Sequence, residues 1–167
     1  MKFKLLILVF FLENLAFAQI LPKFEIGDTL PNFSFKSNFK RNYSLSDLKG
    51  SYVLVFFWSS WNKESREIQK DMFPIFNKFK DKKFSKGRKF YVVSVSIDDS
   101  KKLWEFALKK DNPPWNYHQC DFRGWNSTVV QACRVNAIPF NYLLNSDGVI
   151  VGKNMNAQEL ERLLYGY

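Results

Sequence analysis

The sequence YVLVFFW at residues 52–58, followed by SSWNKES at residues 59–65, decides the fold. A continuous apolar run of this length is typical of a strand that is buried on both faces of a sheet. Residues 91–97 (YVVSVSI) form a second such run. Between the two runs, apolar side chains recur at the spacing of one helix face, at Ile68, Met72, Ile75, Phe76 and Phe79. The region therefore predicts a strand–helix–strand unit.

The segments that follow continue this alternation of strands and helices. A second helix is expected around residues 103–108, after the N-capping residues Asp98-Asp99-Ser100. Further elements are expected as an extended piece at 117–120, a helix at 128–135, strands at 140–144 and 149–151, and a helix around 160–164. Asn145-Ser146-Asp147-Gly148 is a hairpin turn signal between the last two strands. The order β, α, β, α, β, α, β, β, α predicts an α/β protein whose central mixed β-sheet is flanked by helices on both faces.

Length and composition indicate one globular domain. The chain has 167 residues, of which 46% are hydrophobic and 25% are charged. This composition excludes a disordered, collagen-like or multi-span membrane protein. No linker rich in Pro, Gly or Ser divides the chain, so a single folded domain is expected.

Residues 1–18 have the three parts of a secretory signal peptide. Lys2 and Lys4 provide a basic start, residues 5–12 (LLILVFFL) form an apolar run, and Ala16-Phe17-Ala18 is an A-x-A cleavage site. The apolar run is shorter than the roughly twenty residues that span a membrane. We expect export to the periplasm or the exterior, with no stable membrane span after cleavage, and a mature domain at residues 19–167.

The chain is basic, with a formal net charge of +9. The densest basic stretch is residues 78–89, which contains seven Lys or Arg residues and one Asp. A solvated helix end and loop accounts for such a stretch, and binding to an anionic surface or acidic partner is the alternative. Because the export signal argues against nucleic acid, no nucleic-acid partner is expected.

Several short motifs, taken in order, resemble one family. They are residues 27–33 (GDTLPNF), 45–50 (LSDLKG), 57–61 (FWSSW), 95–98 (VSID), 136–140 (NAIPF) and 147–150 (DGVI). Over roughly residues 24–165 the chain resembles exported thioredoxin-like thiol-disulfide oxidoreductases of the ResA/TlpA type, which are related to the peroxiredoxins. The resemblance implies a thioredoxin-like fold.

The catalytic motif of that family is replaced in this chain. The resemblance places W-C-x-x-C after the first core strand, where the start of a helix favours a thiolate. This chain has Trp61-Asn62-Lys63-Glu64-Ser65, so Asn62 and Ser65 occupy the two cysteine positions and no catalytic pair is intact. Asn62 and Ser65 either start a helix only or keep a binding role. Whether the chain is an enzyme is open at this point.

Two cysteines lie elsewhere, Cys120 and Cys133. They suit a structural disulfide, two separate buried thiols, or a displaced redox pair. The only histidine, His118, would project to the same side of an extended segment as Cys120 and could stabilise its thiolate. Zinc sites need three or four ligands, so no metal is expected, and no motif calls for a cofactor.

The resemblance places a cis-proline loop at Ile138-Pro139, opposite the usual catalytic cysteines. In the family the backbone beside this proline pairs with an extended substrate segment. Trp61, Ile138, Pro139 and Phe140 are therefore expected to form a binding groove for an extended segment of an exported protein or peptide.

Two functional classes follow from the sequence. One is an exported thioredoxin-fold module that binds a protein or peptide through the groove and lacks ordinary CxxC dithiol exchange. The other is an atypical thiol-disulfide oxidoreductase that uses Cys120 and Cys133 or a partner's thiol. A peroxiredoxin-type peroxidase is disfavoured because no cysteine occupies the early helix.

Overall fold

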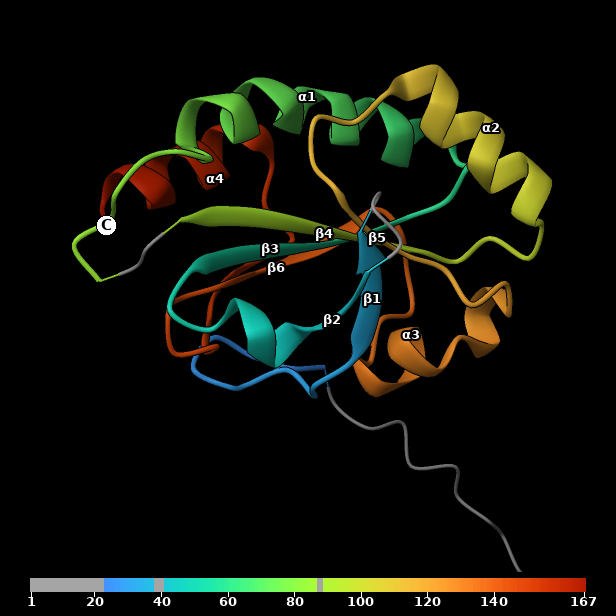
Figure 1. Ribbon diagram of the computed structural model, residues 1–167. Coiled ribbons are helices and arrows are strands. Elements are labelled where there is room, and N and C mark those ends of the chain that lie inside the picture. Colours follow the sequence, from blue (N-terminus) through green and yellow to red (C-terminus); the bar gives the residue numbers. More distant parts are fainter. Residues whose placement is uncertain (1–22, 38–40, 87–88) are drawn as a thin grey trace, which may run out of the picture.

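One mixed β-sheet organises the molecule (Figure 1). The computed structural model describes residues 23–37, 41–86 and 89–167, so the expected signal peptide at residues 1–18 lies outside the described residues. Among the described residues, seven strands pair in the order β2-β1-β5-β4-β3-β6-β7. Their bounds are β1 Ser34–Ser37, β2 Asn42–Ser44, β3 Tyr52–Trp58, β4 Phe90–Ser96, β5 Tyr117–Gln119, β6 Phe140–Leu144 and β7 Ile150–Lys153. The sheet is parallel through β3, β4 and β5 and antiparallel at its other contacts.

Strand β3 lies at the centre of the sheet and is buried along its whole length. Its alternate residues Val53, Val55 and Phe57 belong to one hydrophobic cluster, and Leu54, Phe56 and Trp58 belong to another on the opposite face. A strand covered on both faces needs apolar residues at every position, which explains the unbroken run in the sequence. The predicted β3 and β6 have the bounds that the sequence indicated.

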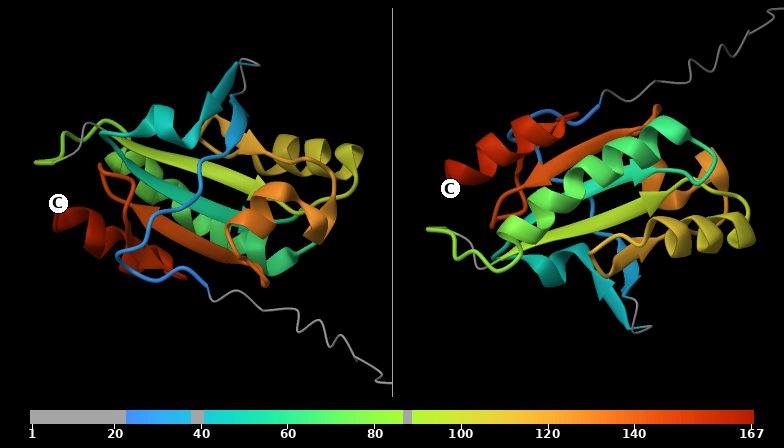
Figure 2. Two further views of the ribbon diagram at one scale, coloured as in Figure 1. Left: turned by 90° about the horizontal axis from the view of Figure 1, so that it is seen from below. Right: turned by 90° about the horizontal axis from the view of Figure 1, so that it is seen from above.

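Helices cover both faces of the sheet, as predicted (Figure 2). The helices α1 (Lys63–Phe79), α2 (Lys101–Asp111) and α4 (Ala157–Tyr165) lie on one face. On the other face lie α3 (Thr128–Ala132) and the short 3-10 helix η1 (Leu45–Leu48); a second 3-10 helix, η2, spans Gly124–Asn126. None of the helices in the described ranges combines the length and the apolar character needed to span a membrane.

The N-terminal hairpin β1–β2 was not predicted from the sequence. Strand β1 alternates exposed and buried residues over four positions, and β2 has only three residues. Such short strands carry too few apolar residues to produce a recognisable pattern. Phe35 and Tyr43 anchor the hairpin through ring contacts with Tyr117 of β5, at 5.3 Å and 5.1 Å between ring centroids.

Helix α3 is shorter than the predicted 128–135. It ends at Ala132 because Arg134 has a left-handed backbone conformation, with φ 55°. The amide of Val135 then donates to the carbonyl of Val130 at 3.2 Å, which closes the helix end in the manner of a Schellman motif. The apolar periodicity of residues 128–135 does not reveal this stop.

The only histidine of the chain is buried in the sheet. His118 lies in β5, and its Nδ1 is 2.7 Å from the hydroxyl of Ser94 on β4. Burial lowers the pKa of His118 to about 4, although a backbone hydrogen bond with Trp115 partly opposes this. His118 is therefore neutral at pH 7.

The free energy of unfolding should fall as the pH drops from about 6.5 towards 4. Unfolded histidine binds a proton near pH 6.5, whereas folded His118 does not until about pH 4, so acid favours the unfolded chain by up to roughly 3 kcal/mol. Urea unfolding at a series of pH values measures this. In the variant His118→Gln, the free energy of unfolding should change little between pH 6.5 and 5, the range in which histidine is the side chain that ordinarily titrates. A wild-type free energy of unfolding that is already constant over this range would contradict the lowered pKa of His118.

Candidate functional site

Three loops meet at one end of the sheet. Strand β3 ends at Trp58, which pairs with Ser96 at the end of β4, while Phe57 pairs with Phe140 at the start of β6. Because these strands are neighbours, the segments 59–62 and 97–100, which follow β3 and β4, and the segment 136–139, which precedes β6, lie at the same end of the sheet. The helix α1 begins directly after the first of them.

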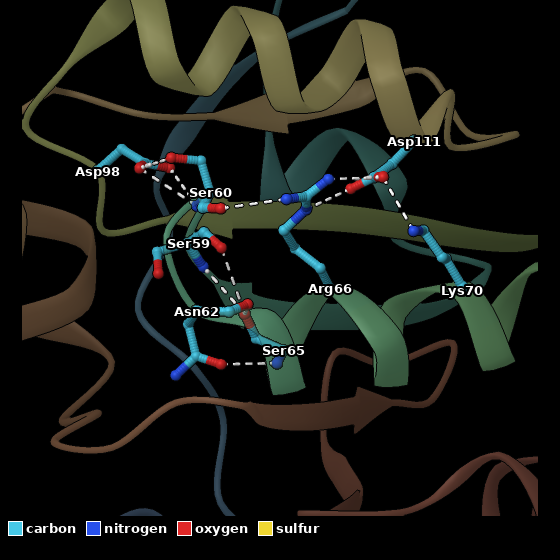
Figure 3. Close-up of polar contacts among 8 residues, drawn as sticks. All are labelled: Ser59, Ser60, Asn62, Ser65, Arg66, Lys70, Asp98 and Asp111. Atoms are coloured by element: carbon cyan, nitrogen blue, oxygen red, sulfur yellow. Dashed lines mark hydrogen bonds and ion pairs between the residues drawn. The ribbon is translucent and has the colours of Figure 1, made fainter.

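A buried carboxylate joins two of these loops (Figure 3). Asp98 is only 1% exposed. Its carboxylate accepts hydrogen bonds from the backbone amide of Ser60 at 2.9 Å, the hydroxyl of Ser60 at 2.5 Å and the hydroxyl of Ser96 at 2.5 Å. A buried charge needs such donors to offset its desolvation. Asp98 therefore fixes the turn that leads from β3 into α1.

Asn62 and Ser65 are used in starting helix α1. Asn62 is the N-cap, and its side-chain oxygen accepts a hydrogen bond from the amide of Ser65 at 2.7 Å. Ser65 is fully buried, and its hydroxyl lies 2.9 Å from the carbonyl of Asn62 and 3.3 Å from that of Ser59. Among the described residues, no carboxylate or imidazole contacts this hydroxyl, so nothing activates it as a nucleophile.

An ion cluster holds α1 against the end of α2. The guanidinium of Arg66 makes two hydrogen bonds to Asp111, at 2.6 Å and 2.8 Å, and Lys70 lies 3.0 Å from the same carboxylate. Burial alone would raise the pKa of Asp111, but the contacts with Arg66 and Lys70 outweigh burial and lower it. Arg66 also reaches the carbonyl of Ser60 at 3.5 Å.

The predicted groove residues differ in how much surface they offer. Trp61 is 56% exposed, and Ile138 and Pro139 are half-buried. The Ile138-Pro139 peptide bond is cis. Phe140 is buried against Tyr142, with 4.9 Å between ring centroids, so its ring supports the loop rather than facing a partner.

The loop before β6 makes no hydrogen bonds to other backbone groups in the described part of the chain. Within the described part of the chain, no backbone–backbone hydrogen bond involves residues 136–139, and Asn136 and Ala137 are exposed. Unpaired backbone groups at the end of a sheet can pair with an extended segment of another chain.

The two cysteines are free thiols in separate environments. Cys133 is fully buried in the cluster on the α3 face, and burial raises the pKa of its thiol to about 12. Cys120 is half-buried, donates weakly to the carbonyl of Asp98, and also has a raised pKa because of burial. Of the three interpretations of the pair, two separate thiols describes this arrangement, with Cys133 buried as expected and Cys120 only half-buried.

His118 lies on the side of β5 that the sequence predicted, where it lines one pocket with Cys120. The expected stabilisation of a thiolate is not supported, however. His118 is neutral and bonded to Ser94, and the thiol of Cys120 is protonated. Neither group has the charge that an imidazolium–thiolate pair requires.

At the start of α1, the side-chain oxygens of Asn62 and Ser65 bond to nearby backbone groups. Among the described residues, no cluster of three or more His, Cys, Asp or Glu side chains is placed to hold a metal ion. The sequence interpretation missed Ser60 and Arg66 as site residues. Their partners Asp98 and Asp111 lie 38 and 45 positions away, beyond the reach of any local pattern.

The seven-stranded mixed sheet with helices on both faces is a thioredoxin-like fold, which this chain shares with solved thiol-disulfide oxidoreductases. A family model described as thioredoxin-like matches residues 50–150. The chain belongs to this thioredoxin-like family and is of its ResA/TlpA type, which confirms the resemblance and the fold predicted from the sequence motifs.

Individual relatives agree with this assignment. Thiol-disulfide oxidoreductase ResA of Bacillus cereus is 24% identical over 141 residues, which cover 84% of this chain and 76% of the relative. The thioredoxin domain of a thiol-disulfide oxidoreductase from Bacteroides vulgatus is 25% identical, with a TM-score of 0.74 over 86% of this chain and 98% of that one. A thiol-disulfide oxidoreductase from Bacteroides fragilis is 26% identical, with a TM-score of 0.69 over 83% and 98% of the two chains.

Replacing Asp98 with Ala should lower the free energy of unfolding by roughly 2–4 kcal/mol. The substitution leaves the amide of Ser60 and two hydroxyls without their buried acceptor. The matched control is Asp99→Ala, since Asp99 is the exposed neighbour. Urea unfolding of both variants measures the difference, and equal stabilities would refute a structural role for the Asp98 carboxylate.

Proposed function

We propose that this protein is an exported thioredoxin-fold module that binds an extended segment of a protein or peptide. The binding site is the groove formed by Trp61 and the loop Ile138-Pro139 at the end of the sheet. The module acts without dithiol exchange at the start of α1. The observation that carries the proposal is the use of Asn62 and Ser65 as helix-capping and buried hydrogen-bonding groups.

The chemistry of the helix start supports the absence of dithiol exchange. Disulfide exchange needs a thiolate that attacks and a second thiol that resolves the mixed disulfide. Asn62 and Ser65 supply neither, and the amide of Ser65 already donates to Asn62. The thioredoxin scaffold is kept, while the family's usual reacting atoms are missing from these two positions.

The exposed surface around the loop supports a binding role. Trp61 presents a large ring beside the start of α1. Asn136 and Ala137 are exposed, and residues 136–138 make no backbone–backbone hydrogen bond within the described chain. Strand-like pairing provides affinity without requiring a particular sequence, and exposed aromatic side chains provide apolar contact. An extended peptide fits both features better than a compact ligand.

The alternative, an oxidoreductase that uses Cys120 and Cys133, has less support. Burial raises the pKa of both thiols, so both are protonated at neutral pH and poorly nucleophilic. They also lie in different surroundings, one beside α2 and one in the core on the α3 face.

Export is the part of the proposal that rests on the N-terminal sequence. The basic start, the apolar run at 5–12 and the A-x-A site at residues 16–18 support cleavage after Ala18. The partner would then be a protein or peptide of the same exported compartment. The basic stretch of sequence at residues 78–89 is consistent with acidic neighbours but is not needed for the groove.

The peptide-binding role is tested with the S-alkylated B chain of insulin, an extended peptide without free thiols. We expect Trp61→Ala to weaken its binding about tenfold in fluorescence polarisation, because the exposed ring is lost while the buried core is unchanged. The matched control is Phe106→Ala, which removes another exposed aromatic ring, on α2.

Binding that is equally strong in the wild type and both variants would rule out the groove as the peptide site. Absence of saturable binding of this peptide to the wild type would contradict a site based on main-chain pairing. Ile138→Asp provides a second test within the loop, with Ile26→Asp as the control at an exposed position outside it.

A further inference from the structure

Helix α2 presents an exposed face that combines apolar and basic side chains. It is the outermost helix of its layer, because α1 lies between α2 and α4 (Figure 2). Of its eleven residues only Ala107 is buried, whereas Leu103 is 52% exposed and Phe106 is 63% exposed. Large apolar side chains that lie together on a surface can mark an interaction site.

Phe106 is surrounded on this face by one leucine and three lysines. Side chains three or four positions apart are neighbours on a helix. The neighbours of Phe106 at these distances are Lys102, Leu103, Lys109 and Lys110. All five residues are exposed, and at 3.6 residues per turn they fall within an arc of about 120°. We call this set the α2 outer face and propose that it binds to an anionic lipid surface.

The α2 outer face carries three positive charges and no acid. Both acids of α2 already have basic partners, since Glu105 lies 3.8 Å from Lys101 and Asp111 is bound by Arg66. Within the described residues, none of the three lysines of the face takes part in an ion pair. Their charges therefore remain available to attract anionic lipid headgroups.

The composition of this face fits a lipid surface better than a protein interface. The core of a protein interface is depleted in lysine, so a phenylalanine surrounded by three lysines is poorly suited to one. At a lipid surface, leucine and phenylalanine enter the boundary between headgroups and acyl chains, while lysine side chains extend to the phosphates. The face also contains no groove for a partner's side chain, because the pocket beside α2 is lined from the other side of the helix, by Lys101, Trp104, Glu105 and Leu108.

The α2 outer face is separate from the proposed groove. It includes neither Trp61 nor any residue of 136–139, so attachment to lipid does not depend on peptide binding. Two apolar side chains bury far less surface in lipid than an inserted helix does, and the lysines act through charge. We therefore expect attachment to be reversible and to weaken as the salt concentration rises.

The test measures sedimentation of the chain from Gln19 onward with lipid vesicles. This form contains every described residue and lacks the apolar run at residues 5–12, which would itself bind lipid. We expect it to bind vesicles made of equal amounts of phosphatidylglycerol and phosphatidylcholine. Vesicles of phosphatidylcholine alone, which carry no net charge, should bind it roughly a hundredfold more weakly.

The contribution of charge is tested by replacing the lysines of the α2 outer face. The triple variant Lys102→Gln, Lys109→Gln, Lys110→Gln should bind the mixed vesicles roughly a hundredfold more weakly than the wild type. The matched control removes the same charge from exposed positions in the basic stretch at 78–89, by Lys80→Gln, Lys83→Gln, Lys86→Gln. This control should bind like the wild type at physiological ionic strength, because charges distant from the bound face are screened.

The contribution of apolar contact is tested with the double variant Leu103→Ser, Phe106→Ser, which should weaken binding to the mixed vesicles about tenfold. Trp61→Ala, the control at an exposed aromatic residue outside α2, should bind like the wild type. All replaced side chains of the α2 outer face are exposed, so urea unfolding should show that these variants are as stable as the wild type.

Three results would overturn the proposal. They are absence of wild-type binding to the mixed vesicles, an equal loss of binding in the two lysine variants, and full binding by the double variant. Poly-L-glutamate is the comparison probe for an acidic polypeptide. A wild type that binds this polymer through the three lysines of the face, but does not bind the vesicles, would identify an acidic protein as the partner and would also overturn the proposal.

Discussion

The hydrogen bonds to the Asp98 carboxylate are the constraint on which the site depends. They tie the end of β4 to the turn after β3, so the first residues of α1 are held in one position. The carbonyl of Asp98 also accepts from Cys120, and the carbonyl of Ser60 accepts from Arg66. Asp98 therefore connects the helix start with Cys120, and Ser60 and Arg66 extend the connection to Asp111 at the end of α2.

The central layers of the fold follow from local sequence, whereas the site follows from contacts that are distant in sequence. The unbroken run at residues 52–58 predicts β3 because both faces of that strand are covered, and the apolar stripe predicts α1. The hairpin β1–β2 is too short to give a pattern, and Arg134 ends α3 through its backbone conformation alone. Asn62 was recognised as a helix cap, but the pairing of Arg66 with Asp111 has no local signal.

The replaced residues at the start of α1 fit the needs of the backbone there. The first amides of a helix lack hydrogen-bond partners within the helix, and the side-chain oxygen of Asn62 accepts a hydrogen bond from the amide of Ser65. The buried hydroxyl of Ser65 can donate its hydrogen to the carbonyl of Asn62 or to that of Ser59. The helix start is therefore satisfied without thiols at these two positions, which is the physical basis of the proposed binding role.

Insulin reduction by the wild type and by the double variant Asn62→Cys, Ser65→Cys tests this account most directly. We predict no reduction of insulin by the wild type in the presence of dithiothreitol beyond the reagent's own rate. The double variant should form a reversible disulfide and accelerate the reaction, since the helix start keeps its geometry. Reduction by the wild type, or a folded double variant whose two new thiols never form a bond, would contradict the account.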